Sequence, residues 1–192
     1  MHEIKTLLEL AGADLTPADV GDATLVLIDI QEEYRSGPIA VAGFEAAASA
    51  AARLLNKARE GGSPIVHVAH KGRAGGLFDR DAERGQIAAE VAPLPGEAVI
   101  EKGLPNAFTG TNLLALLENA GRKNIILAGF MTHMCISSTA RAALDLGYRV
   151  TIQADGCATR DLPDGFGGVI SAAVVHNVAL AELADRFAIV AR

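Results

Sequence analysis

The 192-residue sequence is poor in the features that assign a chain to several broad classes of protein. It contains only two cysteines, Cys135 and Cys157, which are too few for a disulfide framework, so we expect a reducing, cytoplasmic location. No apolar run approaches the roughly 18 residues that a membrane span needs. The N-terminal stretch has no basic segment followed by an apolar one, so we do not expect a secretory signal.

The charge balance argues against polyanionic partners. The chain has 23 acidic and 17 basic residues and a formal net charge of −6. A nucleic-acid binder with a basic face, or a protein that docks on an anionic membrane, requires the opposite balance. We therefore expect a small-molecule partner and neither nucleic acid nor membrane.

Several motifs of cofactor-dependent and serine-dependent enzymes are also absent. The chain has no G-x-G-x-x-G fingerprint, no P-loop and no G-x-S-x-G elbow. His67 and His70 lie three apart on a predicted strand and so point to opposite faces, which argues against a shared metal. We predict no cofactor and no metal site.

What the chain does have is a large apolar content, half of its residues, arranged in alternating β-branched and Ala/Leu-rich segments. Its length predicts a single domain over residues 1–192. Periodicity predicts strands over 23–30, 64–70, 98–102, 124–130, 149–154 and 187–191. It predicts helices over 44–60, between Thr111 and Gly121, and over 133–146 and 168–184.

The predicted strands are apolar on both faces, which is typical of a parallel sheet covered on both sides. The sequence thus predicts an α/β fold: a three-layer α/β/α sandwich with a six-stranded, mainly parallel, Rossmann-like sheet. The long, glycine-rich segment 71–96 is predicted to be an active-site loop or lid.

Ligands bind such sheets at the carboxyl ends of the strands. Asp29, His70 and Lys102 end the first three predicted strands, and Cys135 follows the fourth. We therefore expect a carboxylate, an amine and a thiol to meet at one edge of the sheet.

Cys135 is the sharpest of these candidates. If Thr132 caps the helix over 133–146, Cys135 lies in its first turn, where the helix dipole lowers a thiol pKa and free N–H groups can hold an oxyanion. The alternative is a buried cysteine that acts as a small hydrophobic residue.

The other candidates also have two interpretations each. Asp29, embedded among apolar residues, could be a general base for the thiol or an anchor for a loop. Lys102 could pair with Asp29 or be a solvated charge. His133 could line a pocket or bond the start of a helix, whereas Cys157 is interpreted as structural and His176 as an interior or interface residue.

Three motifs carry a family resemblance, and they occur in this order: LIDIQ at 27–31, KGLPNAFTGT at 102–111 and GFMTHMCISSTAR at 129–141. Together they resemble the isochorismatase-like cysteine hydrolases, over residues 23–191. That superfamily includes nicotinamidases, carbamoylsarcosine amidohydrolase and streptothricin hydrolase.

The resemblance implies a catalytic triad of Asp29, Lys102 and Cys135. It also implies a cis peptide bond between Phe130 and Met131, which would aim the N–H groups of Met131 and Cys135 into one oxyanion hole. The same resemblance implies the α/β/α fold and a homo-oligomer, either a dimer or a tetramer.

The departures from the family pattern narrow the activity. Nicotinamidases carry an Asp-x-His metal motif between the first two strands, but residues 32–63 contain neither Asp nor His. Isochorismatases proper cleave a vinyl ether and lack the nucleophilic cysteine. Segment 70–78 resembles a subgroup of unassigned hydrolases related to nicotinamidases and streptothricin hydrolase.

The sequence thus predicts a cysteine hydrolase that cleaves a C–N, amide-type bond of a small molecule through a thioacyl intermediate. The predicted pocket walls share an apolar or aromatic character and are Tyr34, His70, Phe78, Phe108, His133 and Met134. The alternatives are ether hydrolysis with Asp29 as a general acid, and a non-enzymatic binding or redox protein on the same scaffold.

Overall fold

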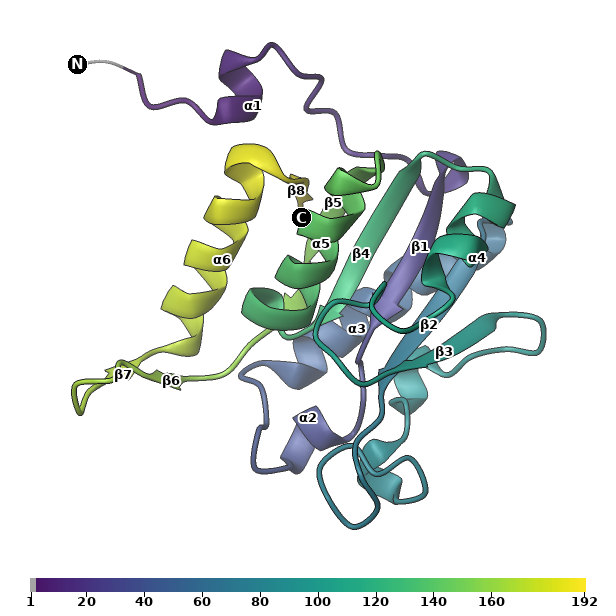
Figure 1. Ribbon diagram of the computed structural model, residues 1–192, viewed down its shortest axis with the longest axis vertical. Coiled ribbons are helices and arrows are strands. Elements are labelled where there is room, and N and C mark those ends of the chain that lie inside the picture. Colours follow the sequence, from purple (N-terminus) through teal and green to yellow (C-terminus); the bar gives the residue numbers. More distant parts are fainter. Residues whose placement is uncertain (1–2) are drawn as a thin grey trace.

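The computed structural model describes residues 3–192 and shows a sheet between two layers of helices (Figure 1). Six strands pair in the order β3-β2-β1-β4-β5-β8, and every pair is parallel. The strands are β1 (Ala23–Ile28), β2 (Ile65–His70), β3 (Ala98–Lys102), β4 (Asn124–Phe130), β5 (Arg149–Ala158) and β8 (Ile189–Ala191). The predicted fold class is confirmed.

The central strands are buried on both faces, as their sequences require. In β1, Leu25 and Leu27 pack into one apolar cluster, whereas Val26 and Ile28 pack into the other. Successive side chains of a strand point to opposite faces, so a strand that reads as continuously apolar needs cover on both sides. The helices supply that cover.

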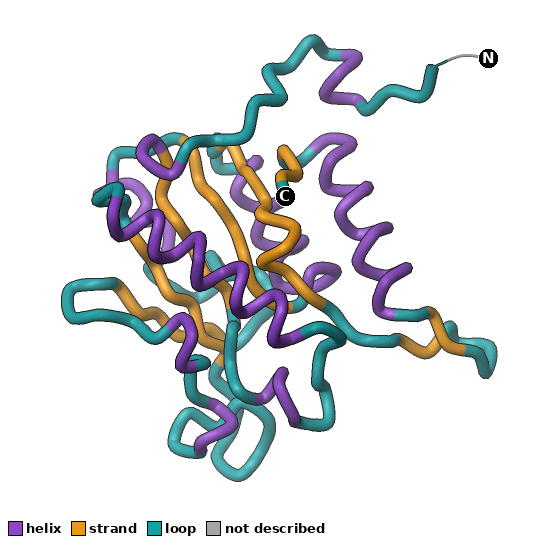
Figure 2. Tube along the Cα trace, turned by 180° about the vertical axis from the view of Figure 1, so that it is seen from behind, coloured by secondary structure: helices purple, strands orange, loops and turns teal. Residues whose placement is uncertain are grey.

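One face of the sheet is covered by α3 (Phe44–Glu60), which Figure 2 shows in front of the strands. Its buried side is built mainly of alanine, so the helix packs closely against the sheet. The opposite face is covered by α4 (Leu113–Ala120), α5 (Ser137–Asp145) and α6 (Ala172–Arg186), as Figure 1 shows. The bounds of α3 agree with the prediction.

The predicted last helix, 168–184, starts too early. A short antiparallel hairpin, β6 (Leu162–Pro163) with β7 (Val169–Ile170), takes up its first residues, and Ser171 then caps α6 by accepting from the Val174 N–H. The hairpin extends away from the sheet in Figures 1 and 2. Two short helices, α1 (Leu7–Leu10) and α2 (Glu33–Ser36), were not predicted because four residues show no period.

Gly129 lets the carboxyl ends of β1 and β4 approach each other closely. Its φ is +132°, and a Cβ at this position would lie 1.9 Å from the Ile28 carbonyl oxygen. Only glycine fits both conditions. The approach brings Asp29, just after β1, next to the end of β4.

No helix among residues 3–192 is long and apolar enough to cross a membrane.

Candidate active site

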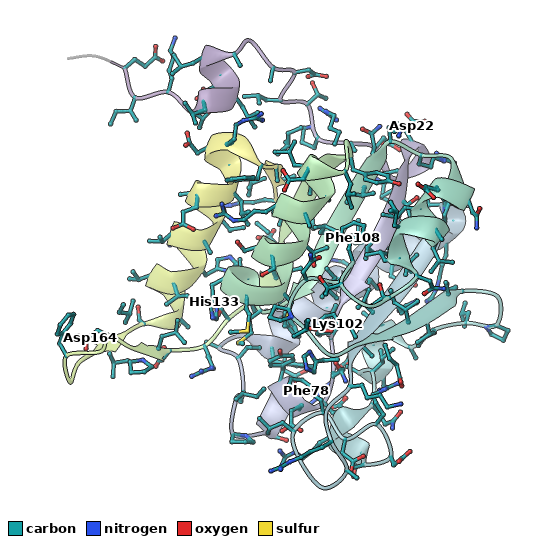
Figure 3. The ribbon with its side chains drawn as sticks, in the orientation of Figure 1. Asp22, Phe78, Lys102, Phe108, His133 and Asp164 are labelled. Atoms are coloured by element: carbon teal, nitrogen blue, oxygen red, sulfur yellow. The ribbon has the colours of Figure 1, made fainter. Side chains whose placement is uncertain are left out.

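A fully buried ion pair lies where β1 and β3 end. Lys102 Nζ is 2.6 Å from Asp29 Oδ2, and both side chains have no solvent exposure. The same Nζ lies 3.1 Å from His70 Nδ1 and 3.4 Å from Cys135 Sγ. A lysine ammonium has three protons, and these three contacts account for all of them. The three predicted strand-end residues and the thiol thus meet around one cation; Lys102 is labelled in Figure 3.

The Asp29 backbone is turned out of the strand. Its φ is +54°, a left-handed conformation that few residues other than glycine adopt and that aspartate tolerates better than most. The Asp29 N–H still bonds the Val68 carbonyl at 2.8 Å, so the turn occurs at the last rung of the ladder. Backbone conformations of this kind are concentrated at functional sites.

His70 is neutral and acts as an acceptor for the lysine. Burial, with the adjacent Lys102 charge, lowers the pKa of His70 to about 4. Because a lysine ammonium can only donate, Nδ1 accepts and the proton of the neutral imidazole is on Nε2. The sequence predicted His70 as a pocket wall, and the structure adds a direct contact with the Lys102 ammonium.

Burial also disfavours charge on the two acids of the cluster. It raises the pKa of the Asp29 carboxyl, against the opposing effect of Lys102. Burial and the neighbouring Asp29 raise the pKa of the Cys135 thiol to about 12. At neutral pH the resting thiol therefore keeps its proton and needs a base to take it.

The expectation that Thr132 caps the helix is wrong, although Cys135 does lie in the first helical turn after β4. Thr132 does not cap a helix: its hydroxyl donates to the Ala158 carbonyl at 3.1 Å. Residues Thr132–Ile136 form a π-type turn, and α5 begins at Ser137, beyond Cys135. Burial and the neighbouring Asp29 carboxylate raise the pKa of the Cys135 thiol, so it does not fall as expected.

The π-type turn changes which backbone N–H groups donate to the Met131 carbonyl. The Met131 carbonyl accepts from Ile136 at 3.3 Å and from Met134 at 3.0 Å. In an α-helix the same carbonyl would take the N–H of Cys135. The Phe130–Met131 peptide bond is cis, as the family resemblance implied.

The predicted pocket residues differ in their contacts and in their burial. Tyr34 and Phe78 are buried with ring centroids 5.2 Å apart, and Phe78 lies 4.7 Å from the His70 ring. His133 bonds the Thr159 hydroxyl through Nδ1 at 2.6 Å. Phe108 packs half-buried against the cluster that contains Cys135, and Met134 is 37% exposed.

Two buried polar residues that the sequence analysis did not single out hold the segment 71–96 in place. The Gln31 amide donates to the carbonyls of His70 and Gly85, at 3.0 and 2.7 Å, and accepts from the His70 N–H at 2.8 Å. The Glu33 carboxylate accepts from the Phe78 N–H at 3.2 Å and pairs with Arg84. The only available signal was their position just after β1.

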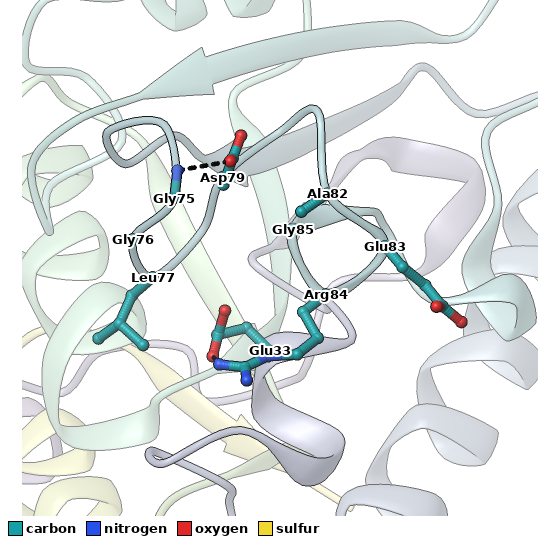
Figure 4. A pocket seen from close by; sticks show the side chains of 9 residues that line it. All are labelled: Glu33, Gly75, Gly76, Leu77, Asp79, Ala82, Glu83, Arg84 and Gly85. Carbon is teal, nitrogen blue, oxygen red and sulfur yellow. Dashed lines mark hydrogen bonds and ion pairs between the residues drawn. The ribbon is translucent and has the colours of Figure 1, made fainter.

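The segment held by Glu33 also borders a cavity of about 550 Å³, shown in Figure 4. The cavity lies between the loop 75–85 and Glu33, and no residue of the Lys102 cluster lines it. Phe78 separates the two places: its N–H bonds Glu33 while its ring contacts His70 and Tyr34. Within the predicted loop or lid 71–96, the Phe78 ring thus lies against the buried cluster at His70.

Arg160 follows β5 and carries an unpaired buried donor. Its Nε is buried and has no hydrogen-bond partner in the described part of the chain, while Nη1 donates to the Asp161 carbonyl at 3.1 Å. The adjacent acid is engaged elsewhere, because Asp161 Oδ1 accepts from the Ala172 N–H at 2.7 Å. Burial and the Arg160 charge lower the pKa of His133, one of the predicted pocket residues.

No group of three or more metal-ligating side chains occurs among residues 3–192.

Comparison with known proteins decides the family. The isochorismatase domain matches residues 23–192. The chain belongs to the isochorismatase family. A solved isochorismatase from Pseudomonas putida KT2440 superposes with a TM-score of 0.95 and is 46% identical, covering 98% of this chain and 97% of that one.

Curated relatives are similar over much of the chain. The secreted isochorismatase effector Isc1 of Verticillium dahliae is 39% identical over 179 residues, covering 93% of this chain and 92% of the relative. A streptothricin hydrolase of Streptomyces noursei is 32% identical, covering 88% of this chain and 62% of the relative. A maleamate amidohydrolase of Pseudomonas putida is 33% identical over 145 residues, 67% of this chain and 68% of the relative.

The family resemblance read from the three motifs is thereby confirmed, and the protein is an isochorismatase-family hydrolase. Its relatives include proteins named maleamate amidohydrolase and ureidoacrylate amidohydrolase.

Proposed function

We propose that this isochorismatase-family member is a cysteine amidohydrolase with Asp29, Lys102 and Cys135 as its catalytic triad. The observation that carries the proposal is the single ammonium of Lys102 in contact with both the carboxylate and the thiol, at 2.6 and 3.4 Å. Transfer of the thiol proton to Asp29 moves a negative charge from oxygen to sulfur. Lys102 stabilises that charge in both places, so the transfer changes no net charge in the buried site.

The reaction then follows in two halves. The Cys135 thiolate attacks the amide carbon, and the N–H groups of Met131 and Cys135 hold the oxyanion. Asp29 returns its proton to the leaving amine, and a thioacyl enzyme remains. Asp29 next takes a proton from water, whose oxygen attacks the thioester. The C–S bond breaks, the acid leaves, and Asp29 returns the proton to the Cys135 thiolate.

Arg160 supports a narrower substrate class. A buried guanidinium donor without a partner is costly unless a ligand satisfies it, and guanidinium groups bind carboxylates through paired hydrogen bonds. The substrate proposed here is therefore a small amide that also carries an anionic group. Tyr34, Phe78 and His133 are the proposed apolar and polar walls between Cys135 and Arg160.

The test is intact-mass spectrometry and ammonia release with a panel of small primary amides, with and without a carboxylate. The wild type should form an adduct on Cys135 and release ammonia, and Cys135→Ala should do neither. Cys157→Ala is the matched control, because it removes the other buried thiol and should leave turnover unchanged. Ammonia release by Cys135→Ala at the wild-type rate would exclude nucleophilic catalysis by this thiol.

A further inference from the structure

His176, on α6, makes a contact that the proposed mechanism does not use. Its Nδ1 lies 2.9 Å from the Thr132 hydroxyl oxygen. Thr132 is fully buried, and His176 is half-buried. The bond joins a helix of the outer layer to the first residue of the turn that carries Cys135.

The direction of this bond follows from the other partner of Thr132. The hydroxyl has one proton, and it donates that proton to the Ala158 carbonyl at 3.1 Å. The hydroxyl oxygen must therefore accept from His176, whose proton is on Nδ1. A relay of His176 to Thr132 to the end of β5 fixes one hydroxyl from two sides.

Thr132 is placed where its hydrogen bonds can hold the proposed oxyanion donors in position. In the chain it lies between Met131 and Cys135, the two residues whose N–H groups are proposed to hold the oxyanion. Oxyanion stabilisation depends on donors held in place before the reaction, and small displacements of such donors cost rate. We propose that His176 is a positioning residue for the oxyanion hole, acting through the hydroxyl of Thr132.

This proposal rests on the proposed function, because it needs carbonyl attack by Cys135. It predicts a specific order among three variants. The side-chain nitrogen of asparagine is as many bonds from Cα as His176 Nδ1, whereas that of glutamine is one bond farther. His176→Asn should thus keep the bond to Thr132, and His176→Gln and His176→Ala should lose it.

Helix stability runs in the opposite order. Asparagine is a poorer helix residue than glutamine or alanine, so a role limited to the stability of α6 would make His176→Asn the worst of the three. The order of the variants therefore separates positioning from structural support.

Two probes of Cys135 provide the measurement without a known substrate. In acylation by p-nitrophenyl acetate, sulfur bonds the acetyl carbon, the thiol proton passes to Asp29 and p-nitrophenolate leaves; the carbonyl oxygen becomes an oxyanion on the way. In alkylation by iodoacetamide, sulfur bonds the methylene carbon and iodide leaves, with no oxyanion. The burst of p-nitrophenol reports the first reaction, and intact mass reports the second.

We expect His176→Ala and His176→Gln to slow acylation by roughly ten- to a hundredfold, less than the loss from deleting a whole oxyanion donor. Alkylation should stay within about twofold of the wild type in all three variants, and His176→Asn should keep acylation within about threefold. Thr132→Val should reproduce the loss, and Thr132→Val combined with His176→Ala should lose no more than Thr132→Val alone.

The outcomes that overturn the inference differ from those that overturn the proposed function. Unchanged acylation in His176→Ala, an equal loss of acylation and alkylation, or an Asn variant as slow as the Gln variant each contradict the positioning role. A wild-type protein whose Cys135 is alkylated but never acylated would instead contradict the proposed function.

Discussion

Strand β2 carries two histidines three residues apart, and each belongs to a different polar cluster. His67 Nε2 lies 2.8 Å from Glu97, which also binds Arg59 at 2.7 Å and the Leu94 N–H at 2.9 Å. His70 belongs to the Lys102 cluster. In the Glu97 cluster every charge has a partner.

The Lys102 cluster is not fully paired in this way. Apart from the ion pair with Lys102, neither oxygen of Asp29 has a hydrogen-bond partner among the described residues. Arg160 Nε is also buried without a hydrogen-bond partner among residues 3–192. Buried polar groups in folded proteins are nearly always paired, and we propose that a substrate supplies the missing contacts of Asp29 and Arg160. The difference between the two clusters is that every charge of the Glu97 cluster is paired, whereas the cluster that we propose to be catalytic keeps unpaired buried groups.

The largest effect should come from Asp29→Asn. Asparagine also tolerates the left-handed backbone but cannot take the thiol proton, so activity should fall by about 10³-fold. The change leaves Lys102 buried without its counter-ion, which should lower the free energy of unfolding by about 3 kcal/mol or more. Steady-state kinetics and urea unfolding measure the two effects.

The matched control is the double variant Asp29→Asn, Lys102→Met. It removes both charges and should regain most of the lost stability while remaining inactive. A double variant as unstable as the single one would show that the ion pair, and not the unpaired lysine, determines the stability.

Arg160→Gln should have the next largest effect. A charge-assisted hydrogen bond is worth about 1.5–3 kcal/mol, so KM for an amide with a carboxylate should rise by about ten- to a hundredfold. KM for the neutral analogue should not change. Arg160→Lys keeps the charge but loses the geometry for paired hydrogen bonds. Its KM for the amide with a carboxylate should lie between those of the wild type and Arg160→Gln. Equal changes for both substrates would show that Arg160 supports the fold and does not bind the substrate.

Glu33→Gln should weaken the lid. It removes the charge that pairs with Arg84 while keeping one oxygen that can accept from the Phe78 N–H. We expect KM to rise by a few-fold, and limited proteolysis within 71–85 to become faster, because the segment opens more often. Arg84→Gln removes the same ion pair from its exposed side and should give a smaller change in the same direction. An unchanged rate of proteolysis in both variants would show that the Glu33–Arg84 ion pair does not hold this segment in place.

Glu97→Gln should change stability and leave activity within about twofold. Arg59 lowers the pKa of Glu97 to about 2 from 4.5, so the ionised carboxylate stabilises the fold above pH 4.5. That contribution, at most about 3 kcal/mol, should disappear as the pH falls from 4.5 towards 2. Unfolding by urea at pH 7 and at pH 3 should therefore differ less in the variant than in the wild type. A loss of activity in Glu97→Gln would show that the Glu97 cluster does more than stabilise the fold.

The sequence was sufficient for the sheet because each strand carries its own signal. Residues 98–102 and 124–130 are strands within the predicted bounds, and α3 agrees at both ends, since apolar period and glycine stops are local features. The strand-end rule then brought Asp29, Lys102 and Cys135 together, as the structure does.

The sequence was not sufficient where a property depends on distant partners. The raised pKa of Cys135 comes from burial and from Asp29, more than a hundred positions away, and no local pattern encodes it. The contacts of Gln31 and Glu33 with the lid were missed for the same reason, because their partners lie in a loop without periodicity. Arg160 gave no signal until its neighbours were known.

Gly129 has a further consequence for how this chain can vary. The space between β1 and β4 at this position is smaller than one methyl group, so every substitution must push the two strands apart at the edge where Asp29 leaves the sheet. A substitution at Gly129 would thus disturb both the packing of the two strands and the position of Asp29. In a lineage that gave up its chemistry and kept its fold, Cys135 would be free to drift, whereas Gly129 would remain.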